Sequence, residues 1–241
     1  PDHFGSYQDL ERFGNPVYAD VSDRPLYTTG VGVAFDGNGD YLKGSNLNNP
    51  ANSRGSIGHD DTPGDVTAHA PGPNNYNGIA NRYYQVWAKP NAADAANPDK
   101  TQSLVMDANQ HGVQIVNGIW SMRYNSGNFD SGVAVADTVD GNGWAHVMVA
   151  RPLGTGGGSR LYVNGEAVAV APGGYTGGDK SELVLGSNTG RDADNEFSGG
   201  TEDFYNGILD DLTMTLVGDN TGNAGPPQGM INHEFDLAVD N

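Results

Sequence analysis

Residues 204–214 read Phe-Tyr-Asn-Gly-Ile-Leu-Asp-Asp-Leu-Thr-Met, and this stretch decides the fold class of the chain. Gly207 permits a tight turn of the backbone, and the apolar pair Ile208 and Leu209 anchors the following strand in a core. The acidic pair Asp210 and Asp211 comes next, at the rim of that strand, where carboxylate oxygens suit a hard cation. The stretch therefore predicts a core strand with an acidic margin.

Other short alternating segments precede this strand, and turn residues separate them. Residues 31–42 predict a hairpin, because the Asn38–Gly39 pair between the two apolar runs tolerates positive φ. A second hairpin is expected around Asn164–Gly165. Further strands are expected near residues 83–90, 103–107, 112–116, 119–124, 132–136, 144–151, 160–164, 167–171, 182–186 and 207–217. Many short strands with turns between them are typical of a β-sandwich.

The composition supports this class and excludes several partners. The 36 glycines and 13 prolines among 241 residues favour turns over long helices. The chain has no cysteine, so disulfides and thiolate metal sites are excluded, and no apolar run is long enough to predict a membrane span. The net charge is −18, from 30 acidic and 12 basic side chains, which makes nucleic acid and anionic membranes poor partners. The excess aspartate suits calcium coordination, or equally a solvated surface in salty surroundings.

Six segments occur in the order found in laminin-G-like, concanavalin-A-like jelly-roll domains, and the chain resembles that family over about residues 31–217. The segments are Phe-Asp-Gly-Asn-Gly-Asp-Tyr-Leu at 35–42, Tyr-Gln-Val-Trp-Ala-Lys-Pro at 84–90, Gly-Trp-Ala-His-Val at 143–147, Leu-Tyr-Val-Asn-Gly at 161–165, Leu-Val-Leu-Gly at 183–186, and the 204–214 stretch. The resemblance implies a two-sheet antiparallel jelly-roll sandwich. Residues 1–30 are then expected to form an extended lead-in arm that packs on the domain, with 218–241 as a loop and a C-terminal tail or edge strand.

The resemblance also implies a calcium ion at the edge of the sandwich. It assigns Asp210 as the carboxylate ligand from the closing strand, with Asp36 and Asp40 of the opening turn as its neighbours. Calcium takes six to eight oxygen ligands, which a loop that mixes carboxylates and free carbonyls is able to supply. The alternative is that Asp36 only forms an Asx-turn and that Asp210 caps the end of a strand.

A second candidate calcium site is the segment 191–196, Arg-Asp-Ala-Asp-Asn-Glu. Its alternating acids Asp192, Asp194 and Glu196 resemble half of a calcium loop, but the position-6 glycine and the flanking helices of an EF-hand are missing. The alternative is an acidic turn paired with Arg191.

An enzyme is not expected. Bacterial glucanases that share this sandwich carry Glu-x-Asp-x-x-Glu on one strand, which places two glutamates on one face. None of the six glutamates of this chain lies at that spacing from another on a strand. The sequence also lacks the Gly-x-Ser-x-Gly pattern of a nucleophile elbow, the His-Glu-x-x-His pattern of a zinc-binding helix and a phosphate-binding loop.

Aromatic side chains are the candidate ligand contacts, because sugar-binding sandwiches stack pyranose rings on exposed Trp or Tyr. If Val147 and Leu161 point into the core, then Trp144, His146 and Tyr162 point to the opposite face of the same sheet. These three are the predicted ligand-binding residues. The alternative for each of them is packing beneath a covering layer.

The sequence therefore predicts a non-catalytic, calcium-stabilised binding module for glycans or matrix, located outside the cell or at its surface. A polysaccharide or glycoconjugate is the expected partner. The alternative is a self-assembling structural subunit of an extracellular fibre or surface layer, in which neighbouring copies pair through the arm and the tail. An accessory domain of a larger hydrolase is a third possibility.

Overall fold

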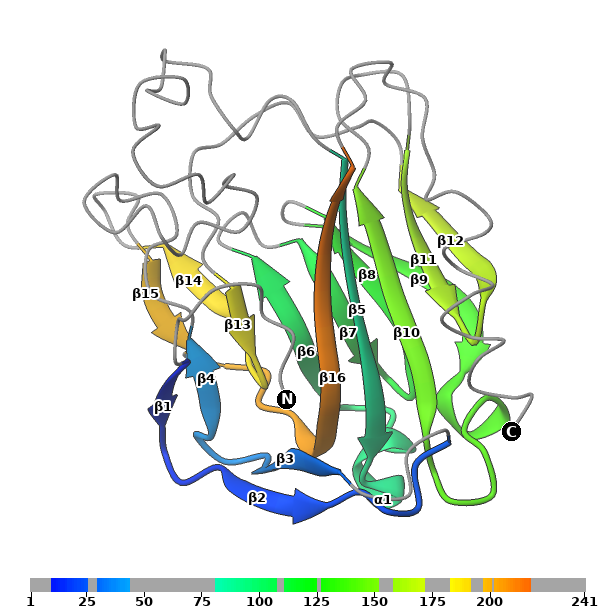
Figure 1. The fold of residues 1–241 in the computed structure, drawn as a ribbon. Coiled ribbons are helices and arrows are strands. Elements are labelled where there is room, and N and C mark those ends of the chain that lie inside the picture. Colours follow the sequence, from blue (N-terminus) through cyan, green and yellow to red (C-terminus); the bar gives the residue numbers. More distant parts are fainter. Residues whose placement is uncertain are drawn as a thin grey trace.

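The computed structural model describes residues 10–25, 30–43, 81–107, 111–124, 127–151, 158–171, 183–191, 197–200 and 202–217. Within these residues, two seven-stranded antiparallel sheets stack face to face (Figure 1). Sheet A contains, in spatial order, β1 (Glu11–Phe13), β4 (Tyr41–Lys43), β13 (Leu183–Leu185), β6 (Thr101–Asp107), β7 (Gly112–Val116), β8 (Ile119–Tyr124) and β9 (Gly127–Ala134). Sheet B contains β12 (Glu166–Ala171), β11 (Ser159–Val163), β10 (Ala145–Arg151), β5 (Asn81–Pro90), β16 (Asn206–Val217), β3 (Val31–Asp36) and β2 (Val17–Asp20). The predicted two-sheet jelly-roll sandwich is confirmed.

Three shorter features complete the described fold. A two-stranded sheet pairs β14 (Thr189–Arg191) with β15 (Phe197–Gly200). The helix α1 (Ala92–Ala95) follows β5, and its cap residue Asn91 accepts hydrogen bonds from two backbone amides of the first turn. The 3-10 helix η3 (Val135–Asp137) follows β9.

The strand β16, which contains most of the 204–214 stretch, lies near the middle of sheet B between β5 and β3. Leu209 faces the sandwich core, whereas Ile208 packs on the outer face of the sheet. A register shift follows Asp210, and Asp211 has a positive φ of 47°. The acidic pair therefore marks a bulge in the middle of a strand, and it does not cap a strand end.

The core lies between the two sheets and follows the period-two alternation of the strands. From sheet B it takes side chains such as Val147, Val149, Leu161 and Val163, and from sheet A Val113, Ile115, Trp120 and Met122. Each of these eight is at most 2% exposed. Burying them on both inner faces supplies the hydrophobic contribution that holds the sheets together.

Two predicted local features differ in detail. The strand expected near 132–136 runs from Gly127 to Ala134, because Val135 turns into η3 and its amide donates to the Gly118 carbonyl at 3.0 Å. In the first hairpin, positive φ falls on Gly37 and Gly39, on either side of Asn38. The second hairpin has positive φ at both Asn164 and Gly165, as a type I′ turn requires.

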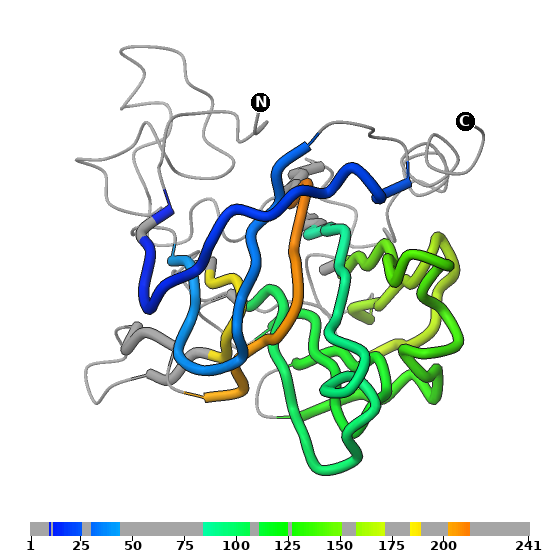
Figure 2. The backbone as a smooth tube through the Cα atoms, turned by 90° about the horizontal axis from the view of Figure 1, so that it is seen from below, coloured from blue at the N-terminus to red at the C-terminus, as the bar shows by residue number. Residues whose placement is uncertain are grey.

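The N-terminal segment contributes one strand to each sheet. β1 pairs with β4 at the edge of sheet A, and β2 pairs with β3 at the edge of sheet B. Figure 2 shows residues 10–25, in dark blue, crossing the lower end of the molecule in front of the other strands. A short chain segment therefore joins the edges of both sheets.

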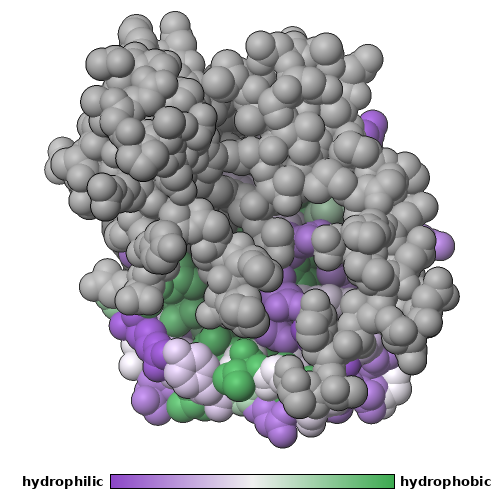
Figure 3. Space-filling view, in the orientation of Figure 1, coloured by the Kyte–Doolittle hydropathy of each residue, from purple (hydrophilic) through white to green (hydrophobic). Residues whose placement is uncertain are grey.

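The described surface in Figure 3 mixes hydrophilic and hydrophobic residues at the lower end of the molecule. The exposed large apolar side chains there include Val17, Tyr18 and Val31 of the β2–β3 edge. Among the described residues, no helix has the length and apolar character needed to cross a bilayer.

Candidate functional site

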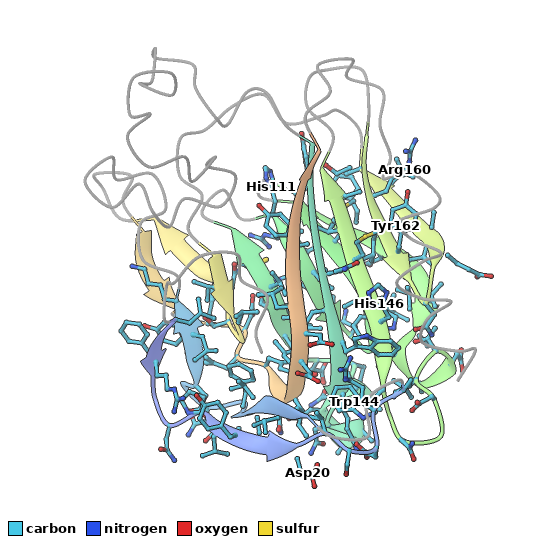
Figure 4. All side chains as sticks on the ribbon, viewed as in Figure 1. Asp20, His111, Trp144, His146, Arg160 and Tyr162 are labelled. Carbon is cyan, nitrogen blue, oxygen red and sulfur yellow. The ribbon has the colours of Figure 1, made fainter. Side chains whose placement is uncertain are left out.

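The predicted ligand-binding residues Trp144, His146 and Tyr162 lie along the outer face of sheet B (Figure 4). Val147 and Leu161 face the opposite sheet, so the two faces divide as the alternation predicts. However, the three side chains are only 1%, 3% and 6% exposed. A buried ring offers no open face on which a sugar can stack, so packing, the alternative interpretation, describes these residues.

The segment 21–24 covers the end of this face that contains Trp144. Val21 packs against Trp87 and Trp144, and the indole N–H of Trp144 donates to Asp23 Oδ1 at 3.0 Å. The lead-in arm is therefore an integral cover of the sheet, and it brings charged groups over a buried aromatic cluster.

Arg24 is the central charge of this cover. Its Nε lies 2.8 Å from Asp210 Oδ2, its Nη2 lies 2.7 Å from Asp211 Oδ2, and its guanidinium lies 5.7 Å from the Trp87 ring centroid. The Arg24 side chain is 2% exposed, so the pair with Asp210 (11% exposed) is nearly dry, whereas Asp211 is half exposed. Burial, together with the Arg24 charge, lowers the pKa of His146 to about 4.

The structure does not bring the predicted calcium ligands Asp36 and Asp210 together. Asp36 pairs in register with Asn206, and Asp210 lies four residues further along β16, roughly 13 Å away at the rise of a strand. Asp36 Oδ1 instead accepts the amide of Asn38 at 2.7 Å, which is the Asx-turn alternative. Asp210 pairs with Arg24, a basic partner that the sequence interpretation did not include.

The Asp40 carboxylate accepts hydrogen bonds from backbone amides in two separate parts of the chain. Its Oδ1 accepts the amide of Asn15 at 2.6 Å, and its Oδ2 accepts the amide of Asp36 at 3.2 Å. A Cβ at Gly14 would meet Asp40 Oδ1 at 2.4 Å, and Gly14 has a φ of 71°, so glycine is required there. Asp40 therefore ties the β1–β2 link to the β3–β4 turn.

The second predicted calcium set, Asp192, Asp194 and Glu196, lies outside the described residues and remains a prediction. Within the described part of the chain, no three His, Asp or Glu side chains gather as a metal site would need.

A polar row on the outer face of sheet A has no counterpart in the sequence predictions. It consists of Ser103, Gln114 and Ser121, which are neighbours across β6, β7 and β8. All three are fully buried, although they point away from the apolar core. Gln114 Nε2 donates to Ser103 Oγ at 2.7 Å. Burying polar side chains without hydrogen-bond partners is unfavourable, so a buried polar row on the outer face of a sheet is expected to hold other polar groups in place.

Asp203 lies directly on this polar row. Its carbonyl accepts the amide of Ser103 at 2.8 Å, and its Oδ2 accepts from Asn188 Nδ2 at 3.1 Å and from Gln114 Nε2 at 3.5 Å. Burial raises the pKa of the Asp203 carboxyl, and the charge of Glu202 adds to this, against the hydrogen bonds from Asn188 and Gln114. Asp203 also has a positive φ of 55°, in the left-handed region that aspartate adopts more often than most non-glycine residues.

Further acids flank Asp203 on the same face. Ser121 Oγ donates to Asp130 Oδ1 at 2.6 Å, and Asn188 Nδ2 also approaches Glu202 Oε1 at 3.4 Å. The Arg123 guanidinium, next to them on β8, donates from Nη1 to Asn128 at 3.1 Å. Asp130 and Glu202 are exposed, so this face presents carboxylate oxygens around a buried polar floor.

The side-chain amides of Gln114 and Asn188 orient the Asp203 carboxylate, and only the position of Gln114 was predictable from the sequence. Gln114 stands between Val113 and Ile115 in an alternating strand, which places it on the non-core face. Nothing local marks Asn188 or Asp203, because their contacts join residues far apart in the chain.

A laminin G-type model of the concanavalin A-like lectin/glucanases superfamily matches residues 79–215, more than half of the chain. A search of curated proteins finds no match. Among solved structures, domain 4 of AbnA, an extracellular arabinanase from Geobacillus stearothermophilus in complex with arabinotriose, is similar at a TM-score of 0.51 and 14% identity, over 93% of this chain and 82% of that domain.

Receptor-binding domains of botulinum neurotoxins are similar as well. The binding domain of neurotoxin DC in complex with SialylT has a TM-score of 0.55 and 12% identity over 99% of this chain and 49% of that one. The mosaic serotype C/D domain has a TM-score of 0.55 and 13% identity over 96% and 46%. This chain thus spans about half the length of the toxin domains, and at such identities the likeness shows the fold alone. Together with the family match, it shows that the chain belongs to the concanavalin A-like lectin/glucanases superfamily.

Proposed function

We propose that this chain is a non-catalytic, extracellular glycan-binding module and that Asp203 is its central ligand contact. The observation that carries the proposal is the fixed carboxylate of Asp203. Its Oδ2 is held by the amides of Asn188 and Gln114, which are buried, while the residue itself is only half-buried. Two buried amides that orient one accessible carboxylate form a preorganised acceptor.

Sugar hydroxyls are the chemistry that fits such an acceptor. A carboxylate accepts several hydrogen bonds, and bonds to an ionised acceptor are stronger than neutral ones. Both hydrogen bonds that the described residues make to the Asp203 carboxylate go to Oδ2, and Oδ1 is the oxygen that we assign to a ligand hydroxyl. The proposal agrees with the superfamily and with two neighbours whose structures contain arabinotriose and SialylT.

The proposed binding is non-catalytic because no two of the six glutamates lie at the Glu-x-Asp-x-x-Glu spacing of the glucanases that share this sandwich. The acids of this face do not supply that motif: Glu202 and Asp203 are adjacent in the chain, and both accept from Asn188 Nδ2, at 3.4 Å and 3.1 Å.

A glycan array followed by calorimetry tests the proposal. We expect the wild type to bind at least one glycan, and Asp203→Ala to weaken that binding at least tenfold because it removes the charged acceptor. Glu166→Gln is the matched control, since Glu166 is exposed at the start of β12 in the other sheet. Circular dichroism checks that each variant is folded. Equal binding by wild type and Asp203→Ala would contradict the assignment, and release of reducing ends would contradict the non-catalytic part.

Self-assembly is a second candidate function, and the edge of sheet B favours it. β2 is the last strand of that sheet, and Val17, Tyr18 and Val31 on this edge are 51%, 66% and 61% exposed. An exposed apolar edge strand is a template for pairing with another chain. Light scattering across a concentration series tests it: we expect association that Val17→Lys abolishes, and a persistent monomer at high concentration would contradict this function.

A further inference from the structure

We propose that the N-terminal segment, residues 10–25, exchanges between two copies of this chain, so that the segment of each copy fills the site of the other. The inference rests on self-assembly, the second candidate function, and names the segment and the partner through which assembly occurs. Three features carry it: how the segment is bound, how it is connected to the rest of the chain, and which apolar side chains stay exposed beside that connection.

The N-terminal segment is held at the edges of both sheets by strand pairing. β1 pairs antiparallel with β4, where the Phe13 and Tyr41 rings stack at a centroid distance of 4.5 Å, and β2 pairs antiparallel with β3. The amide of Asn15, between β1 and β2, donates to Asp40 Oδ1 at 2.6 Å. All of these partners come after residue 30 in the chain. A second copy therefore presents the same edges and the same acceptor.

The outer face of sheet B supplies an apolar part of the site. Val21 is fully buried against Trp87 and Trp144, and Ile208 packs on the same cluster. Trp144 lies at the lower end of this face (Figure 4). Without the segment, two indole rings on an outer face would meet water, which is unfavourable. The site is therefore expected to stay filled, by the segment of its own copy or by that of another.

Charged groups determine which segment fits the site. Asp23 pairs with Lys89. Arg24 pairs with Asp210 at 2.8 Å and with Asp211 at 2.7 Å. The Arg24 side chain is 2% exposed, so a segment without a cation at this place would leave the nearly buried Asp210 without its partner. Copies that each carry a net charge of −18 repel one another, whereas this site attracts one short, correctly ordered segment of a second copy.

The connection between the segment and β3 allows exchange. It consists of residues 25–30, and six residues span roughly 20 Å when fully extended. β1 and β2 are end strands of their sheets, so neither sheet has to open in its interior when the segment leaves. Figure 2 shows the segment, in dark blue, crossing the lower end of the molecule in front of the other strands. A second copy at this edge is therefore within reach of the segment.

Exposed apolar side chains beside the connection favour the exchanged dimer. Among the described residues, four large apolar side chains are exposed, and three of them, Val17, Tyr18 and Val31, lie on β2 and at the start of β3. Exchange reproduces the contacts that the closed monomer makes in its own site, so those contacts favour neither form. The dimer gains only what it buries in addition, and these three side chains are where two copies meet. Protein concentration then decides which form predominates.

A disulfide between the segment and β3 tests the exchange. The chain has no cysteine, so an introduced pair reports only its own bond. Val17 pairs in register with Ala34, and residues directly opposite on antiparallel strands lie within the range of a disulfide. We oxidise the dimer fraction of Val17→Cys/Ala34→Cys after size exclusion and expect a covalent dimer as the main product. Fragment masses should show position 17 linked to position 34 in that dimer.

The control pair is Arg160→Cys/Val170→Cys, which lies in register within the β11–β12 hairpin. No part of this hairpin belongs to the exchanging segment, so we expect its disulfide to form within one copy. Circular dichroism checks that each variant is folded.

Dilution of the wild-type dimer is a second measurement, which needs no substitution. Exchanged copies separate only after two strands and the buried Arg24 have been released, so we expect the dimer to decay over minutes or longer, the slow end of the range for docking steps. A dimer that separates at once and whose 17–34 disulfide lies within one copy would overturn the inference while leaving self-assembly in place. A monomer at every concentration would overturn self-assembly itself, and with it this inference.

Discussion

Acidification is expected to destabilise this fold through His146. The folded state lowers the pKa of His146 from 6.5 to about 4, because the ring is buried and faces the charge of Arg24. The unfolded chain therefore binds a proton at a pH where the folded chain does not, and stability is lost as the pH falls from about 6.5 towards 4. Between pH 7.5 and 4.5 the loss from this one group is about 2.5 kcal/mol, and about 3 kcal/mol is lost well below pH 4.

Urea unfolding at pH 7.5 and 4.5, followed by tryptophan fluorescence, measures this loss. His146→Phe is the informative variant, since an aromatic ring keeps the contact with Trp87 at a centroid distance of 5.3 Å and removes the titration. The relevant quantity is how much more stability the wild type loses than the variant. The pH dependence of the other titrating groups is the same in both proteins and cancels in this comparison. Hydrogen bonds from Lys89 and Lys100 lower the pKa values of Asp23 and Asp94, respectively. The stability that these two carboxylates contribute is lost mainly below pH 3.8.

We expect the wild type to lose about 2 to 3 kcal/mol more than His146→Phe between these two pH values. Equal losses in the two proteins would refute the reasoning. An NMR titration that gave His146 a pKa near 6.5 in the folded protein would refute it independently, because the ring would then be hydrated and away from Arg24.

Three further outcomes are expected, two from the structure and one from the sequence. Arg24→Ala removes the cation that pairs with the nearly buried Asp210, and we expect the free energy of unfolding in urea to fall by about 3 to 5 kcal/mol. Asp211→Asn removes the half-exposed partner of Arg24, and we expect a loss of less than about 1 kcal/mol. Similar losses for both variants would contradict the argument from burial. Asp203→Asn should raise the midpoint of unfolding at pH 7. Burial raises the pKa of the wild-type carboxyl, so its ionised form destabilises the folded protein at that pH. The difference in midpoint between variant and wild type should disappear below pH 3.8, where the carboxyl is protonated in both states. If the segment 192–196 binds calcium, free calcium at a hundred times the dissociation constant raises the free energy of unfolding by about 2.7 kcal/mol. Thermal melts with calcium and with chelator measure this gain. Neutralising the three acids of the segment should remove it.

The strands and turns were predictable because their signals are local. Alternation places Val147 and Leu161 on the core face, and the Asn164–Gly165 pair has the positive φ values that its turn requires. These features depend on residues close together in the chain, where side-chain period and backbone preference act directly.

The candidate site was not predictable because its contacts are distant in sequence. Gln114 and Asp203 are 89 positions apart, and Arg24 and Asp211 are 187 positions apart. The resemblance to jelly-roll domains placed Asp210 at a metal, but a basic residue from the N-terminal segment pairs with it here. The aromatic residues Trp144 and Tyr162 face outwards as expected, yet a period-two pattern does not reveal that this face is covered.

The position of β16 has a consequence for how the chain matures. This strand is the last one described in the sequence, and it joins β5 to β3 inside sheet B. Until residues near 217 are available, β2 and β3 have no attachment to the rest of their sheet. During synthesis from the N-terminus, the domain therefore cannot close before nearly all of it has left the ribosome, and long-range pairing of this kind is slow. In a nascent chain halted before Asn206, the segment that forms β2 and β3 is expected to remain protease-sensitive, because its partner strand β16 is missing.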